Sequence, residues 1–127
     1  DLDRIYAENG SKVHRQLFAN AIRYLHKNLM VKTKGLPSAG RVTLLHQENK
    51  NRFIIHLLYA PPLERGRCLV IEDLPEIHNV ELTINLDKEI KNAYFLNLEK
   101  KIIIKRNNDL IIKVDKFQMH EALILEY

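Results

Sequence analysis

Residues 52–75 read RFIIHLLYAPPLERGRCLVIEDLP, and this stretch decides the fold. An apolar run over residues 53–58 is followed by a Pro61–Pro62 break, a second apolar run over residues 67–71 and a stop at Pro75. Runs bounded in this way are typical of strands joined by loops. Both faces of the first run are mostly apolar, so it predicts a central strand that is covered on both sides.

The alternation of apolar and polar residues continues toward the C-terminus and is cleanest over residues 79–86. We predict eight strands, over residues 41–46, 53–58, 67–71, 79–86, 92–98, 101–105, 110–115 and 120–127. Asn107-Asn108 indicates a tight turn. No helical pattern lies between these strands, so the predicted fold is mainly β, an antiparallel β-sandwich of about eight strands. The residues expected to face inward are Val42, Leu44, Phe53, Ile55, Leu57, Val80, Leu82, Ile84, Ile112, Val114 and Ile124.

One N-terminal amphipathic helix is predicted from Ser11, its N-cap, to about Leu29. Apolar residues recur there at three- and four-residue spacing: Val13, Leu17, Phe18, Ala21, Ile22, Leu25 and Leu29. We expect this stripe to cover the sheet, with Leu17, Phe18, Ile22 and Leu25 buried. On that basis Phe18→Ala is expected to destabilise the protein severely.

The organisation expected from these patterns has three parts. Residues 1–31 form a helical segment, either the end of a preceding domain or packed against the sandwich. Residues 32–40, with two glycines and one proline, form a linker, and residues 41–127 form the β-sandwich. The chain begins at Asp1 without a signal peptide's apolar core, so we expect it to start inside a longer product. No apolar run approaches the about 20 residues of a membrane span, so no membrane partner is expected.

Charge and cysteine usage exclude other classes. The net charge is +4, but lysine and arginine are spread along the whole chain, which does not favour nucleic-acid binding. Cys68 is the only cysteine, so no internal disulfide can form. Its apolar surroundings predict a buried thiol.

The sequence offers no catalytic, metal or cofactor site. None of the six histidines has the i, i+4 spacing of a helical zinc site, and His46 and His56 are expected to be at most a chance cross-strand pair. A glycosidase needs two carboxylates about 5–10 Å apart. Glu48 and Glu72-Asp73 are the only acids beside candidate loops, and adjacent strand residues point to opposite faces. The chain is therefore not expected to be an enzyme by itself.

Sugar binding is a separate hypothesis, because β-sandwiches often stack aromatic rings on sugars. The chain has no Trp, and Tyr59, just before the Pro-Pro loop, is the aromatic residue best placed to face solvent. A Tyr59 that packs in the core is the alternative. The candidate interface or ligand loop consists of Tyr59, Pro61, Pro62, Glu64 and Arg65.

Three segments also carry a family resemblance: residues 52–75, residues 10–17 (GSKVHRQL) and residues 36–47 (LPSAGRVTLLHQ). They resemble the C-terminal region of bacterial glycoside hydrolases that carry a β-galactosidase-type trimerisation domain. The resemblance implies a parent with a catalytic (β/α)8 barrel, a flavodoxin-like middle domain and a small C-terminal β-domain. Residues 13–17 resemble the last helix of the middle domain, and residues from Arg41 onward resemble the β-domain. The family's catalytic glutamates lie on barrel strands, and no residue here matches them.

The resemblance implies a non-catalytic C-terminal accessory domain of a β-galactosidase-like glycoside hydrolase, which acts by interdomain packing. Its partners would be the remainder of the parent hydrolase, a homo-oligomer formed through the parent, and carbohydrate. Two alternatives stay open: a carbohydrate-binding module and a free-standing β-sandwich adaptor. No cofactor is expected under any of the three.

Overall fold

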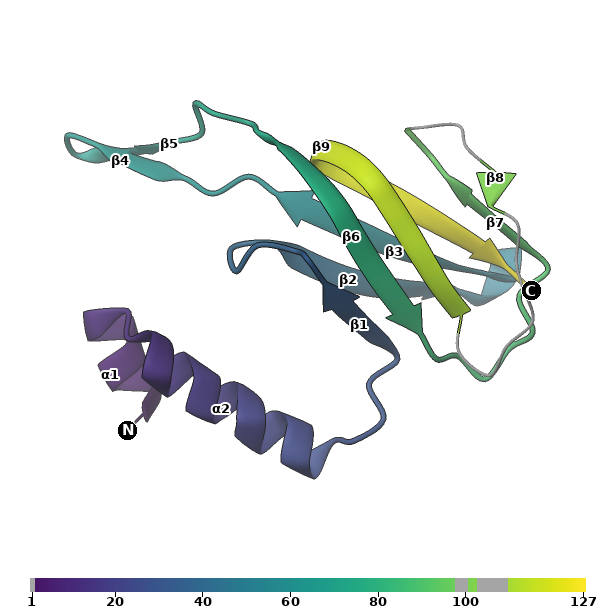
Figure 1. The fold of residues 1–127 in the computed structure, drawn as a ribbon, viewed down its shortest axis with the longest axis horizontal. Helices are drawn as coiled ribbons and strands as arrows, with labels where there is room; N and C mark the ends of the chain where they lie inside the picture. Colours follow the sequence, from purple (N-terminus) through teal and green to yellow (C-terminus); the bar gives the residue numbers. More distant parts are fainter. Residues whose placement is uncertain (1, 98–100, 103–109) are drawn as a thin grey trace.

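The computed structural model describes residues 2–97, 101–102 and 110–127 (Figure 1). The helices are α1 (Leu2–Asn9) and α2 (Lys12–Leu25), and a single 3₁₀ turn, η1, spans Glu48–Lys50. The strands are β1 (Val31–Lys34), β2 (Arg41–Gln47), β3 (Arg52–Tyr59), β4 (Leu63–Arg65), β5 (Cys68–Val70), β6 (Glu76–Ile84), β7 (Asn92–Phe95), β8 (Lys101–Ile102) and β9 (Leu110–Glu126).

All strand pairs in the described residues are antiparallel, and β9 joins two layers. Its first half pairs with β6, which pairs with β1, and its second half lies between β3 and β7. The change of partner occurs at Met119, which follows the last residue paired with β6 and is the first residue paired with β3. Met119 has a φ of 60°, so a single left-handed residue turns the strand from one layer into the other. The mainly-β, sandwich-like fold is therefore as predicted.

The core lies between the two layers and is built from one face of each long strand. Its buried members are Phe53, Ile55, Leu57, Ile77, Val80, Leu82, Ile84, Ala93, Phe95, Ile112, Val114, Phe117, Leu123 and Leu125. The predicted inward residues are confirmed with two qualifications of position. Val42 and Leu44 are half-buried at the margin of this core. Ile124 is buried on the opposite face of its strand, against Ile54 and Ala122.

Three elements differ from the sequence prediction. The strands expected over 110–115 and 120–127 are one continuous strand, β9. The loop expected at residues 61–66 contains β4, which pairs with β5 in a hairpin. Residues 31–34, at the start of the expected linker, form β1 and pair with β6. The Asn107-Asn108 turn lies outside the described residues, as do residues 103–105 of the predicted strand there.

Gly35 allows β1 to lie against β6. It follows β1 with a φ of 83°, and a Cβ atom at this position would lie 2.7 Å from the carbonyl oxygen of Asn79. Any other residue would clash with the β6 backbone and adopt a disfavoured φ. The short strand β1 is thus held at the edge of its layer by a glycine.

The helical segment contains two helices and does not cover the sheet. Gly10, with a φ of 60°, separates α1 from α2, and Ser11 is the N-cap, although its side chain makes no capping hydrogen bond. Figure 1 shows both helices extending away from the strands. The prediction that Leu17, Phe18, Ile22 and Leu25 are buried is wrong, because all four side chains are exposed.

Candidate functional site

The most distinctive surface of the molecule is one broad side of α2. The helix buries none of its residues. The exposed fractions of its apolar side chains are 74% for Val13, 52% for Leu17, 58% for Phe18, 44% for Ile22 and 83% for Leu25. We call these five residues the α2 face. An apolar stripe of this width normally packs against another element. The sequence of α2 is therefore typical of a buried helix, whereas its apolar side chains are exposed.

Helix α1 extends this surface. It packs against α2, and the Gly10 N–H donates to the Tyr6 carbonyl oxygen at 2.8 Å, which closes the turn between the two helices. Ile5 and Tyr6 remain 37% and 40% exposed. The two helices therefore present apolar side chains as one unit rather than as two independent segments.

A small apolar hollow opens between the helices. It is lined by Asp3, Tyr6, His14, Arg15 and Phe18, and its surface is almost entirely apolar. The Nδ1 atom of His14 is buried and has no hydrogen-bond partner. Leaving a buried polar atom unpaired costs about 1–3 kcal/mol. This nitrogen is therefore a place where a group from outside the chain would gain a hydrogen bond.

The β4–β5 hairpin is a second projection. In Figure 1 it extends beyond the sheets at the same end of the molecule as the helices. It exposes Leu63, Leu69 and Ile71. Cys68 also lies there and is exposed. The prediction of a buried thiol is wrong, because the apolar run around Cys68 forms a two-stranded hairpin that neither layer covers.

The five residues of the candidate loop expected between Tyr59 and Arg65 do not form one surface. Tyr59 is half-buried and packs on the main core, and Pro61 is also half-buried. Pro62 and Glu64 are exposed. Arg65 is exposed and pairs with Glu72, with both Nε and a terminal guanidinium nitrogen 2.9 Å from its Oε2 atom. The tyrosine and the charged residues thus do not converge on one site.

The histidines are paired differently from the expectation. His46 lies opposite Phe53, and His56 lies opposite Thr43, so the two histidines are not cross-strand neighbours. Instead, His56 Nδ1 lies 2.9 Å from His120 Nε2 on β9. Burial, and then the charge of His120, lower the pKa of His56. In the described residues, no three His, Cys, Asp or Glu side chains gather as a metal site would require.

Three acidic side chains have structural partners. Glu121 is only 1% exposed, and its Oε1 atom accepts hydrogen bonds from the Asn97 and Ala122 N–H groups at 3.0 and 2.9 Å. Sequence reasoning missed it, because only its position opposite Leu57 in the sheet places it inside. Glu72 is held by Arg65, and Glu76 by Lys116 at 2.7 Å. The hydrogen bond from Lys116 lowers the pKa of Glu76. For Glu76 this shift is opposite to the raised pKa that a glycosidase acid needs.

Comparison with known proteins finds similarity among solved structures. No protein-family model and no curated protein sequence matches the chain. Among solved structures, the chain is similar to the α-L-fucosidase isoenzyme 2 from Paenibacillus thiaminolyticus, with 32% sequence identity and a TM-score of 0.90. The match covers 99% of this chain and 20% of the fucosidase chain. The chain thus spans about one fifth of the length of that enzyme.

Two points follow from this comparison. The similarity supports the glycoside hydrolase part of the sequence-based interpretation and gives no support to β-galactosidase-like specificity. A TM-score of 0.90 over 99% of the chain also includes the helices. Their placement away from the sheets is therefore shared with a solved structure.

None of the described helices is long and apolar enough to cross a membrane.

Proposed function

We propose that this chain is a non-catalytic accessory unit of a glycoside hydrolase and that it docks on the rest of that enzyme through the α2 face. The observation that carries the proposal is that α2 buries none of its residues while five apolar side chains remain 44–83% exposed. The hydrophobic effect makes such a surface costly in water, so it favours a partner that covers it.

The comparison favours one occupant for this surface. Four fifths of the similar fucosidase chain lies outside the matched region, while the helices lie within it. A helix that is placed alike in both proteins, and whose apolar side is open in this chain, is well suited to pack on the remainder of a longer polypeptide. The hollow beside His14 fits the same role, because a donor or acceptor from that remainder would satisfy its buried Nδ1 atom.

The proposal assigns the chemistry to the remainder of the enzyme. In the described residues, the acidic side chains discussed above are engaged in ion pairs or hydrogen bonds, and Glu121 is sealed in the interior. A retaining or inverting glycosidase needs a protonated acid and a second carboxylate that both face a sugar. The 127-residue chain is therefore proposed to support the catalytic part and to leave its specificity, whether for fucosides or other glycosides, to that part.

The test is an activity assay on purified 127-residue protein with nitrophenyl α-L-fucoside, β-D-galactoside and related substrates. The proposal predicts no hydrolysis above buffer, and hydrolysis of at least one substrate by the full-length product of the gene. A Glu72→Gln variant of the short protein is the control for contaminating or intrinsic activity. Turnover by the short protein that this variant abolishes would overturn the non-catalytic assignment.

A further inference from the structure

A groove separate from the α2 face and from the β4–β5 hairpin opens at the edge between the two layers. Its volume is about 760 Å³, within the usual range of about 300–1,000 Å³ for ligand pockets. It is bounded by the connection from α2 to β1, by the inward side of β2 and β3, and by the segment after β6. None of the residues of the predicted Tyr59 loop contributes to it.

The groove has apolar lining residues and a polar rim. The buried or half-buried residues Leu44, Phe53 and Leu86 form its floor, whereas Met30 is 59% exposed. Asn28, Glu48, Asn85, Asp87 and Lys88 line the rim, and all five are exposed. Small-molecule sites usually combine an apolar surface with polar groups that fix the orientation of the ligand, and this groove contains both.

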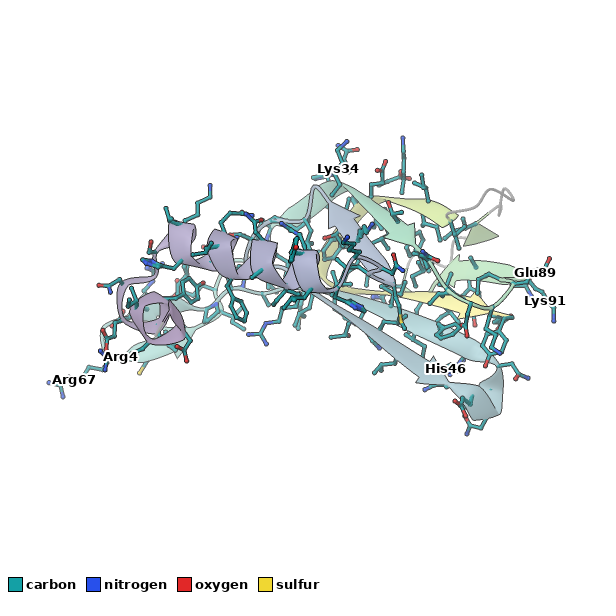
Figure 2. All side chains as sticks on the ribbon, turned by 90° about the horizontal axis from the view of Figure 1, so that it is seen from below. Arg4, Lys34, His46, Arg67, Glu89 and Lys91 are labelled. Atoms are coloured by element: carbon teal, nitrogen blue, oxygen red, sulfur yellow. The ribbon has the colours of Figure 1, made fainter. Side chains whose placement is uncertain are left out.

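One aromatic ring in the groove is held rigidly. The His46 ring stacks on Phe53, with centroids 4.2 Å apart and an interplanar angle of 16°. Its Nε2 atom lies 2.8 Å from the Tyr127 hydroxyl oxygen, and its side chain stays 34% exposed. In Figure 2, His46 lies toward the end of the β2–β3 pair that is away from the helices. Phe53 covers one face of the ring, and the part of the ring that stays exposed is already held in place for a ligand.

Two backbone hydrogen bonds connect the segments that form the walls of the groove. The Asn85 N–H donates to the Met30 carbonyl oxygen at 2.8 Å, which joins the two sides of the rim. The Lys91 N–H donates to the Glu126 carbonyl oxygen at 2.7 Å, which holds the far end of the segment after β6. Backbone hydrogen bonds of this kind position the rim side chains relative to the floor.

We propose that this groove binds a neutral saccharide. Sugar hydroxyls need donors and acceptors side by side, and the amides of Asn28 and Asn85, the Asp87 carboxylate and the Lys88 ammonium supply both. The apolar floor and the His46 ring suit the C–H face of a pyranose. The rim carries two carboxylates, Glu48 and Asp87, and one ammonium, Lys88, so it disfavours an anionic ligand. The volume leaves room for more than one sugar ring.

The test is a titration of the isotope-labelled 127-residue protein, followed through the side-chain amide signals of Asn28 and Asn85. The ligands are methyl α-L-fucopyranoside, methyl β-D-galactopyranoside and a disaccharide, with glycerol as a hydroxyl-rich control. The groove predicts saturable shifts with at least one sugar, a Kd in the millimolar range or tighter, and no saturation with glycerol.

Variants decide whether the binding belongs to this groove. Asp87→Ala and Asn85→Ala should each weaken binding about three- to tenfold, which is the usual effect of one lost hydrogen bond. Asp73→Ala removes an exposed carboxylate outside the groove and should change nothing. Shifts that increase linearly, as with glycerol, would overturn the proposal, as would saturable binding that Asp87→Ala and Asn85→Ala leave intact. Both outcomes are independent of whether the chain is an accessory unit of a hydrolase.

Discussion

Replacing Phe18 with alanine should hardly change the free energy of unfolding of the 127-residue protein. The Phe18 side chain lies on α2, which buries none of its residues, and it is already 58% exposed. Substitutions at such positions usually change stability by about 0.5 kcal/mol or less. A phenylalanine in the core would cost about 3–5 kcal/mol on the same change.

The same substitution should cost more in the full-length product, if the α2 face docks there. Complete burial of a phenylalanine contributes about 1.5–3 kcal/mol, so burial of its exposed 58% contributes about 1–2 kcal/mol. On average about three fifths of each of the five side chains of the α2 face is exposed. At about 2 kcal/mol for each complete burial, burying the exposed parts of the five side chains would contribute about 6 kcal/mol to docking. Phe18→Ala removes a measurable part of this.

Chemical denaturation of the short and the full-length proteins measures both values. Ile111→Ala is the matched control, because Ile111 is 57% exposed on β9 and is not part of the α2 face. This control should have little effect in either protein. A cost of about 3 kcal/mol or more for Phe18→Ala in the short protein would show that α2 packs on this chain's own core. The absence of any cost in both proteins would show that the α2 face stays in solvent.

Three further predictions concern the sandwich itself. Leu123→Ala should cost about 2–5 kcal/mol in denaturant titrations, because the side chain is fully buried between the layers; a cost below about 1 kcal/mol would contradict that placement. Glu121→Ala should cost about 2–4 kcal/mol because it leaves two N–H groups unpaired, whereas Glu121→Gln keeps an acceptor oxygen and should cost less; equal costs would argue against these hydrogen bonds. The lowered pKa of His56 predicts a loss of stability at acidic pH, because below the ordinary value of 6.5 the unfolded chain takes up a proton that the folded chain does not. Unfolding free energies at pH 7.5 and 5.5 should therefore differ, and His56→Phe should reduce the difference; an unchanged difference in that variant would rule out His56 as the cause.

The strands were predictable where one face of a strand meets a core. Val80, Leu82 and Ile84 alternate with polar residues in the sequence, and the structure buries all three. The continuity of β9 was not predictable. Residues 116–119 lay between two predicted strands, and the left-handed conformation of Met119 lets one strand pass from the first layer into the second.

The α2 helix and the β4–β5 hairpin show that an apolar pattern predicts an element but not its burial. The spacing of Leu17 and Phe18 correctly predicts an amphipathic helix, but periodicity does not identify the partner that covers it. In the same way, the run around Cys68 has the composition of a core strand and forms an exposed hairpin. In both cases the apolar pattern correctly predicts a helix or a strand. Whether that element is buried depends on tertiary or interdomain contacts.

The candidate groove could not be predicted from local sequence patterns either. Its walls come from residues 28–30, 44–53 and 85–88, and the pairing of β1 with β6 brings the first and last of these segments together. Tyr59 stood out in the sequence because it precedes a Pro-Pro break, yet it packs on the core. His46, which no Pro or Gly residue adjoins in the sequence, is the ring that remains open to the groove.

The most direct test of the docking proposal is the reactivity of a thiol placed on the α2 face. A Phe18→Cys variant is made in a Cys68→Ser background, because Cys68 is exposed and would react as well. The rate of maleimide labelling is then compared between the 127-residue protein and the full-length product of its gene. Docking predicts fast labelling in the short protein and labelling at least about tenfold slower in the full-length product, as expected for a site that must open to react. Equal rates in the two proteins would show that nothing covers the α2 face and would contradict the docking proposal.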